Sequence, residues 1–315
     1  MPNIAYETEG FPAAAPIANG AADLTPTWSD LLWAGITVGR PNRQFVFQHG
    51  LASVYEALFR WSLIRMTLEE TGVLMPRFAR TTAARSLDPS EKGAVNYFLG
   101  MTLCKLFSAE LLDAPWLLHL DVFRPQLDAV LIGRSRPDLV GQTQAGEWLA
   151  IESKGRISPP DAPTKTRAKD QALRCVSVGG VAVSYHIGGI AYFRNDVLRY
   201  FWRDPQPAPL VPENAIVLPF DDNLWQHYYR PARDLILSHR EIVPQMLREP
   251  ISMPVESVDL QLGIHPFVLK LLVNERWSEA KQWCVDHLEI LQEGDYQPDG
   301  IRVIAGPSWT LPFDG

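Results

Sequence analysis

The feature that most constrains the fold is a short apolar run, WLAI at residues 148–151, that leads directly into Glu152 and Lys154. Four consecutive apolar residues with polar neighbours are typical of a buried strand. Because side chains two apart on a strand point to the same face, Glu152 and Lys154 should emerge together. The polar turn GQTQAG at residues 141–146 precedes the run, so the sequence predicts a hairpin in which Asp138 reaches the same point from the neighbouring strand.

These residue types at this spacing suit phosphodiester hydrolysis. Two carboxylates that converge on one point form a hard oxygen site for Mg²⁺, and a nearby ammonium can position an attacking water. The alternative interpretation is an ordinary hairpin, on which exposed Glu152 and Lys154 form an ion pair of small energetic value.

Residues 88–193 resemble the PD-(D/E)XK superfamily of restriction-endonuclease-like nucleases, through Pro137-Asp138 and the triplet Glu152-Ser153-Lys154. The resemblance implies an α/β fold with a mixed central sheet flanked by helices. It also implies Mg²⁺ or Mn²⁺ held by the side chains of Asp138 and Glu152 and by the backbone carbonyl of Ser153. Lys154 would act on the attacking water.

The segment before the hairpin predicts a long buried helix. Asp88 is placed as its N-cap, Pro89 in its first position, and Glu91 where it completes a capping box. Apolar residues then recur as far as Leu112, as in a helix that lies under a sheet. Glu91 has a second interpretation as a catalytic acid, since many relatives in the resembled superfamily place an acidic residue of this helix at the metal.

The segment after the hairpin predicts a helix over residues 165–178 with a basic first half. Strands should follow, separated by the glycine pairs 179–180 and 188–189. Gln171 falls where the RecB-like members of the resembled superfamily carry the glutamine of a QxxxY motif, although Cys175 stands in place of the tyrosine. Gln171 is therefore either an orienting residue of the catalytic site or part of a polar helix face.

The charge distribution separates the motif region from the rest of the chain. The whole chain has a net charge of -7, which argues against broad electrostatic adhesion to nucleic acid. Between residues 131 and 175, however, eight cations outnumber five acids. This excess predicts either a local phosphate-binding surface or a solvated charged face. The candidate nucleic-acid contacts are Arg136, Arg156, Lys165, Arg167 and Lys169.

Composition sets the outer limits. The 315 residues are 46% hydrophobic, which is enough for a substantial core. No apolar run approaches membrane-spanning length and no signal-peptide pattern begins the chain, so we expect a cytoplasmic protein. The widely spaced Cys104, Cys175 and Cys284 form no metal or redox motif and should be buried free thiols. A thiol–imidazole pair of Cys175 and His186 would lack a positioned third group.

Three parts are expected along the chain. Residues 1–27 predict an irregular arm, and residues 28–204 would form the nuclease-like domain with an N-terminal helical extension at 43–71. A stripe on this extension is expected in the core: Phe47, Leu51, Tyr55, Phe59 and Leu63. The proline-rich segment 203–214 marks a boundary. Residues 205–315 then predict a mainly helical, aromatic-rich module that ends in a short hairpin or strand, whose aromatic residues either fill a small core or form a nucleobase-stacking or protein-binding surface.

We therefore expect an Mg²⁺- or Mn²⁺-dependent nuclease that acts on DNA rather than RNA, and resemblance alone suggests a role in bacterial defence against phage. The competing expectation is a nuclease-like binding subunit of a larger DNA-processing or defence complex. Such a subunit would contact a protein partner or its own copies through the C-terminal module. Motifs of other chemistries are missing from the sequence: there is no GxSxG elbow, no Walker-type or GxGxxG glycine loop, and no HExxH.

Overall fold

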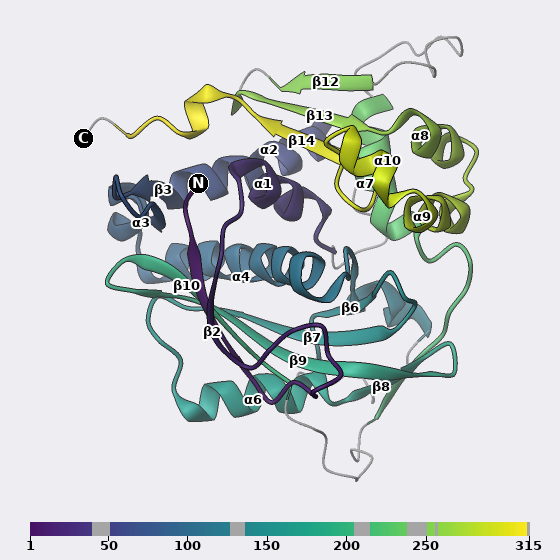
Figure 1. The fold of residues 1–315 in the computed structure, drawn as a ribbon, viewed down its shortest axis with the longest axis horizontal. Helices are drawn as coiled ribbons and strands as arrows, with labels where there is room; N and C mark the ends of the chain where they lie inside the picture. The colour runs from purple at the N-terminus through teal and green to yellow at the C-terminus, as the bar shows by residue number, and fades with distance from the viewer. Residues whose placement is uncertain (40–50, 127–135, 205–214, 238–250, 256–257, 314–315) are drawn as a thin grey trace.

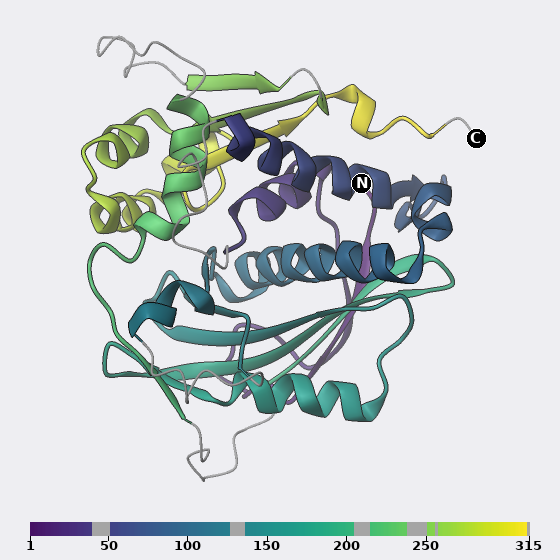
Figure 2. The same cartoon turned by 180° about the vertical axis from the view of Figure 1, so that it is seen from behind.

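A large mixed sheet forms the centre of the molecule (Figure 1). The computed structural model describes residues 1–39, 51–126, 136–204, 215–237, 251–255 and 258–313. Within these residues eleven strands join one sheet, whose main path runs β2-β1-β10-β9-β7-β6-β5. The helices α4 and α6 cover its two faces (Figures 1 and 2). The expected α/β fold with a mixed central sheet flanked by helices is confirmed at this level.

The predicted hairpin is part of an antiparallel meander of β5 (Trp116–His119), β6 (Leu139–Gln142) and β7 (Trp148–Gly155). The next strand in the sheet, β9 (Val181–Arg194), runs parallel to β7, and β10 (Val197–Arg203) returns antiparallel to β9. This mixture of directions follows from the connections, because a short turn joins antiparallel strands whereas parallel neighbours need a crossover. The crossover between β7 and β9 contains α6 (Ala162–Ala172).

The N-terminal residues belong to this sheet. β1 (Ile4–Glu9) pairs in parallel with β10, and β2 (Gly20–Leu24) pairs with β1 in antiparallel fashion. The expectation of an irregular arm over residues 1–27 is therefore wrong. The Ala- and Pro-rich composition of residues 1–27 does not indicate strands. These strands form because β10, which lies far away in the sequence, supplies their backbone hydrogen-bond partners.

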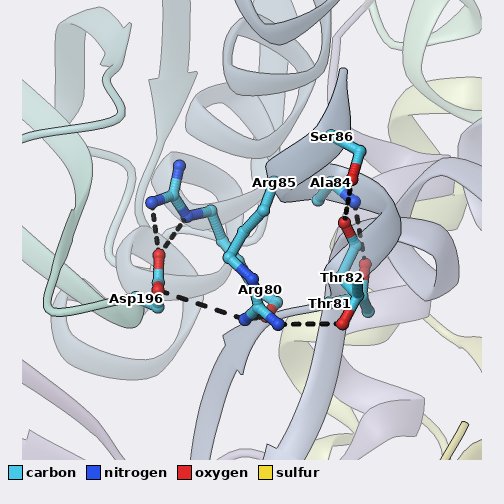
Figure 3. Close-up of polar contacts among 7 residues, drawn as sticks. All are labelled: Arg80, Thr81, Thr82, Ala84, Arg85, Ser86 and Asp196. Carbon is cyan, nitrogen blue, oxygen red and sulfur yellow. Dashed lines mark hydrogen bonds and ion pairs between the residues drawn. The ribbon is translucent and has the colours of Figure 1, made fainter. Parts of the chain in front are cut away.

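Short strands extend the sheet at its margins. Their bounds are Leu68–Thr71 for β3, Arg77–Arg80 for β4, Cys175–Val178 for β8 and Ile216–Leu218 for β11. Figure 3 shows how the β9–β10 turn is fastened to β4 and to the short helix α3 (Thr82–Ser86). The Arg80 Nε donates to Asp196 Oδ1 at 2.9 Å, and Arg85 Nη1 lies 4.0 Å from Asp196 Oδ2. The Asp196 carboxylate is shared by the two arginines and so holds the β9–β10 turn against β4 and α3.

The helix α4 (Pro89–Leu112) begins as the sequence predicts. Asp88 is its N-cap and accepts from the backbone N–H groups of Ser90 and Glu91, and the Glu91 side chain accepts from the Asp88 N–H at 3.0 Å. The helix after the hairpin differs from its prediction. It begins at Ala162, with Asp161 as N-cap, and ends at Ala172 because residues 175–178 pair with β9 and β11 as the strand β8.

Glycines permit both helices to approach the sheet closely. A Cβ at Gly100 of α4 would lie 3.0 Å from the Lys154 carbonyl oxygen, and a Cβ at Gly188 of β9 would lie 2.9 Å from the Lys169 backbone nitrogen on α6. The glycine pair 179–180 forms the predicted turn, with both φ angles positive. The pair 188–189 does not break a strand, which corrects the prediction. It lies inside β9, where α6 leaves no room for a side chain at Gly188 and the side chains of Tyr200 and Cys104 leave none at Gly189.

The C-terminal part combines helices with a second, three-stranded antiparallel sheet in the order β12-β13-β14. The bounds of its elements are Ile251–Val255 for β12, Leu260–Ile264 for β13, Ile301–Ala305 for β14, Gln226–Leu237 for α7, Pro266–Val273 for α8, Trp277–Asp286 for α9 and Leu288–Glu293 for α10. The expected terminal strand is confirmed as β14, and the sequence did not predict β12 and β13, which form this sheet with it. The proline-rich segment 205–214 lies outside the described residues.

The C-terminal part packs on the N-terminal helices and shares a continuous buried core with the rest of the chain. The helix α1 (Trp28–Thr37) lies between α4 and β14 (Figure 1). Its Trp33 Nε1 donates to Asp299 Oδ2 at 2.9 Å, in the turn before β14. No described helix combines the length and apolar character that a membrane crossing requires.

The helix α2 (Leu51–Thr67) is the described part of the predicted N-terminal extension. It ends at Thr67 rather than at Gly72, because Leu68–Thr71 pairs with β4 as β3. Leu63 is buried as expected, but Tyr55 and Phe59 are exposed, so the expected core stripe is wrong at these two positions. Phe47 and the side chain of Leu51 lie outside the described residues.

Candidate active site

The three residues of the predicted motif meet at one end of the β6–β7 pair. Asp138 directly precedes β6, and its Oδ2 accepts from the backbone N–H of Ser153 at 2.9 Å. The backbone N–H of Asp138 donates to the Ile151 carbonyl at 3.0 Å, which extends the ladder to this position. Lys154 Nζ donates to Glu152 Oε1, so both side chains lie on the same side of β7, as their spacing predicts.

The surroundings of Glu152 disfavour its charge. Its side chain is 3% exposed, although it forms an ion pair with the partly exposed Lys154. Burial, followed by the neighbouring Asp138 carboxylate, raises the pKa of Glu152 to about 8, against the lowering effect of Lys154. Burial also raises the pKa of Asp138, opposed by the Ser153 N–H and the Lys154 charge. The alternative interpretation, an ordinary hairpin, predicted that Glu152 is exposed. Glu152 is buried, so this prediction is wrong.

The donor set fits a hard divalent cation. Glu152 Oε2 is buried and receives no hydrogen bond from an N–H or O–H donor among the described residues, and the carboxyl group nearest to Glu152 is that of Asp138. Such an unpaired acceptor, beside a second carboxylate and with both pKa values raised, is stabilised by an added positive charge. Within the described chain, no three side chains of His, Cys, Asp or Glu gather as a metal-binding group. A cation here would therefore depend on two carboxylates and on backbone oxygen, which the resemblance assigns to Ser153.

The helix α4 supports the site from behind. A Cβ at Gly155 would collide with the Asn96 carbonyl oxygen, so the end of β7 touches the first half of α4. Ser153 faces the same helix, where its hydroxyl lowers the pKa of the Cys104 thiol against the larger, opposite effect of burial. At Gly155 and Gly100 the helix and the strand approach each other with no side chain between them, which holds the end of the motif strand in place.

The structure does not bring Glu91 or Gln171 into contact with the motif. The Glu91 side chain forms the capping box with Asp88 and is exposed, which agrees with the capping interpretation. Gln171 lies in the last turn of α6 and is partly exposed. Cys175, the residue at the tyrosine position of the QxxxY motif, lies beyond this helix in β8, so the two positions occupy different elements.

The five candidate DNA contacts occupy different surroundings. Arg167 is exposed, whereas Arg136 is paired with Asp121 and Arg156 donates to Thr164 Oγ1 at 3.2 Å. Lys165 lies 3.6 Å from the centroid of the Phe201 ring. Lys169 is the clear exception, because it is buried.

Lys169 Nζ donates to Asp204 Oδ1 and to the His186 carbonyl, both at 2.6 Å, and its side chain is 5% exposed. Burial lowers the pKa of Lys169, which the Asp204 carboxylate opposes. Removing either partner would leave a buried, unpaired charge. The expectation of Lys169 as a nucleic-acid contact is therefore wrong, since its charge is used inside the fold.

The cysteine chemistry considered from the sequence is not formed. His186 Nε2 contacts the backbone carbonyl of Cys175 at 2.9 Å rather than its thiol. Burial raises the pKa of the Cys175 thiol to about 12, which keeps it protonated and poorly nucleophilic. Cys104, Cys175 and Cys284 are all free and buried, as predicted.

Two neighbours of the site were not predicted. Asp121 follows β5 in a 3₁₀ segment (Leu120–Gln126), pairs with Arg136 and raises the pKa of Asp138. The sequence signal for Asp121 is an acidic residue soon after a short apolar strand. Because the end of β5 pairs with the start of β6, such a residue lies near Asp138. Tyr97 on α4 lies within electrostatic reach of the carboxylates, and its pKa rises to about 12 through burial and then through Asp138. No sequence pattern distinguishes this tyrosine from a helix-surface residue.

Comparison of the chain with known proteins gives no relative: no family model, no curated protein and no solved structure matches it.

Proposed function

We propose that this chain is a metal-dependent nuclease that hydrolyses phosphodiester bonds of DNA, with Asp138, Glu152 and Lys154 at its active site. The observation that carries the proposal is the unpaired, buried Glu152 Oε2 beside Asp138 and Lys154. The order of elements supports the finer, restriction-endonuclease-like description of the fold. A long helix, an antiparallel meander that carries the acids, a crossover helix and a parallel strand follow one another, as the resemblance implies.

Each residue has a distinct task in this mechanism. Asp138 and Glu152, with the Ser153 carbonyl, would hold Mg²⁺ or Mn²⁺, which supplies Lewis-acid activation and neutralises charge on the phosphate. Lys154 positions the attacking water in line with the leaving oxygen and compensates for negative charge near Glu152. Asp138 also keeps the Ser153 N–H occupied, which fixes the orientation of the peptide beside the metal ligands.

The direct test is cleavage of plasmid, linear duplex, single-stranded DNA and RNA in Mg²⁺ or Mn²⁺. We expect Asp138→Asn and Lys154→Ala to lower the rate at least about a hundredfold, the scale at which a positioned catalytic group contributes. Glu147→Gln is the matched control, because Glu147 is an exposed acid on the same hairpin. Cutting of equal rate in wild type and both site variants would refute the assignment.

A second readout is independent of turnover. Mn²⁺ should raise the thermal midpoint of the wild type and of Glu147→Gln, because a ligand that binds only the folded state stabilises it. Asp138→Asn should lose this response. If Mn²⁺ stabilises the Asp138→Asn variant as strongly as the wild type, the cation binds elsewhere.

A role in bacterial defence against phage belongs to this proposal as its biological setting, and plaque formation with and without the active-site variants would test it.

The C-terminal part supports a second candidate, a binding subunit of a larger complex. The rings of His265, Trp283 and His287 stack in sequence, with centroids 4.8 Å and 4.4 Å apart, and all three are partly exposed. Tryptophan is enriched in protein interfaces, and Trp283 lies at the centre of this stack. If the chain cuts no nucleic acid and forms a stable oligomer that ignores DNA in size-exclusion chromatography, this second function is favoured.

A further inference from the structure

Two arginines lie on the same face of the central sheet as the candidate active site. Gly155 touches α4, so its neighbours Lys154 and Arg156 point to the opposite face of β7, the face on which α6 lies (Figure 2). The backbone N–H of Arg156 donates to the Ala191 carbonyl at 2.9 Å, which continues the β7–β9 ladder one residue beyond β7. Arg156 therefore follows Lys154 along this face at about 6.6 Å, twice the rise per residue of a strand.

The sheet register places Arg199 in the same row as Arg156. Lys154 pairs with Ile190 of β9, so Arg156 lies beside Tyr192, two residues further along that strand. Tyr192 pairs in turn with Arg199 of β10. Because paired residues of neighbouring strands point to the same face, the two arginines flank Tyr192 on the face that carries Lys154. We call Arg156, Tyr192 and Arg199 the arginine row.

The arginine row has charged donors without a charged partner. The Nε atoms of Arg156 and Arg199 are buried and have no hydrogen-bond partner among the described residues. Arg156 Nη1 donates to the neutral hydroxyl of Thr164 at 3.2 Å, and no ion pair joins Arg199 to a residue that the structure describes. The Asp161 carboxylate accepts from the Thr164 N–H as the N-cap of α6, and the exposed Glu7 of β1 is paired with neither arginine. The row therefore keeps two positive charges available for an anion.

Other cations on this face already have acidic partners. Lys165 Nζ lies 3.4 Å from Glu9 Oε1, and Arg203 Nε lies 3.5 Å from Oε2 of the same carboxylate. Lys169 is paired with Asp204 inside the fold. Arginine binds phosphate through planar, charged N–H donors, and these donors are free where no carboxylate occupies them. The arginine row is thus better suited to a phosphate than the paired cations are.

We propose that Arg156 and Arg199 bind the backbone phosphate next to the one that is cleaved. The inference rests on the proposed nuclease function and gives it a substrate class, a polynucleotide strand rather than an isolated phosphodiester. Lys154 contacts the reacting phosphate in that function, and the arginine row is one step further along the same face. A strand that places one phosphate at Lys154 would therefore bring the adjacent phosphate to the two guanidinium groups.

The test compares two substrates of the same reaction in Mn²⁺. Bis(p-nitrophenyl) phosphate is a diester with a single phosphate, whereas an oligodeoxynucleotide with hydroxyl ends offers only internal phosphates with neighbours. Arg156→Gln and Arg199→Gln should each raise the KM for the oligonucleotide about tenfold, the scale of one hydrogen bond to a charged group, with kcat unchanged. Neither should alter hydrolysis of the small diester. Arg276→Gln is the matched control, because it removes an exposed positive charge at the start of α9.

A binding measurement does not depend on turnover. Fluorescence anisotropy of a labelled single-stranded oligodeoxynucleotide in EDTA, at a series of salt concentrations, gives the slope of log K against log salt. Loss of one phosphate contact should reduce this slope by about 0.7 in Arg156→Gln and in Arg199→Gln, while Arg276→Gln keeps the wild-type slope.

The outcomes separate this inference from the proposed function. An unchanged KM for the oligonucleotide and an unchanged salt slope in both variants overturn the inference even if the wild type cuts DNA. An equal loss of hydrolysis on both substrates also overturns it, because the arginines would then act on the cleaved phosphate or on the fold. A reduced salt slope in both variants, with no cutting by the wild type in Mg²⁺ or Mn²⁺, supports the arginine row as a phosphate-binding site and refutes the nuclease.

Discussion

At the residue scale, burial controls the behaviour of Glu152. Its pKa rises from the ordinary value of 4.5 to about 8, chiefly because the charged form loses hydration. Between these two pH values the unfolded chain has released the proton while the folded chain still holds it. The free energy of unfolding therefore falls as the pH rises from about 4.5 to about 8. This loss of stability follows from burying a carboxyl group without a bound cation.

Glu152→Gln should consequently be more stable than the wild type at pH 8 in EDTA. We expect its thermal midpoint to be higher by roughly 2–5 °C, with little difference near pH 4, because glutamine does not titrate. Thermal melts at a series of pH values would measure the effect. The control Glu147→Gln, which changes an exposed acid on the same hairpin, should have the thermal midpoint of the wild type at pH 8. A lower midpoint for Glu152→Gln at pH 8 would contradict the burial argument.

At the element scale, the contact of α4 with β7 decides where the motif lies. At Gly100 and Gly155 the two elements meet through backbone, because neither residue has a side chain. An interior glycine usually weakens a helix relative to alanine, so its presence at a contact this close has a packing reason. The same helix contains Gly93, whose absent side chain would meet nothing within 4 Å.

The two glycines of α4 should therefore respond in opposite ways to alanine. Gly93→Ala should raise the free energy of unfolding by about 0.5–1 kcal/mol, since it only improves helix propensity. Gly100→Ala should lower it by about 1–3 kcal/mol, because the methyl group presses on the backbone at Lys154. Urea unfolding measures both. A Gly100→Ala variant as stable as Gly93→Ala would show that β7 can move away from α4 at little cost.

At the scale of the whole molecule, a buried polar network joins the C-terminal part to the central helices. Lys105 of α4 donates to Tyr228 of α7 at 2.6 Å, and the Tyr228 hydroxyl donates to Asp299 at 2.5 Å. Trp33 of α1 donates to the same carboxylate. Burial lowers the pKa of Lys105 to about 7 and raises that of Asp299. Buried polar groups of this kind are tolerated only while each has its partners.

Tyr228→Phe should therefore destabilise the whole chain. The change removes the hydroxyl between Lys105 and Asp299, and we expect a loss of about 1–3 kcal/mol in the free energy of unfolding. Tyr296→Phe is the matched control, because the Tyr296 hydroxyl is buried but has no hydrogen-bond partner among the described residues. Equal stability of the two variants would show that the network does not stabilise the packing of the C-terminal part on the central helices.

Several features of this protein could be predicted from local sequence. The hairpin, the α4 cap at Asp88 and the same-face position of Glu152 and Lys154 depend on residues close together in the chain. Strand alternation and capping are interactions of near neighbours, so their signals survive without tertiary information. The mixed α/β architecture followed from these elements and from the crossover between β7 and β9.

Only the tertiary structure decided the features that depend on distant partners. β1 and β2 became strands because β10 offered an edge, and Lys169 became an internal charge because Asp204 lies opposite it. The pair Gly188-Gly189 remained inside a strand, because α6 closes on Gly188 from one face and the side chains of Tyr200 and Cys104 close on Gly189 from the other. The sequence by itself determined the pattern of Asp138, Glu152 and Lys154. Whether these charges are buried or solvated was decided by packing, because desolvation depends on every element that closes around a group.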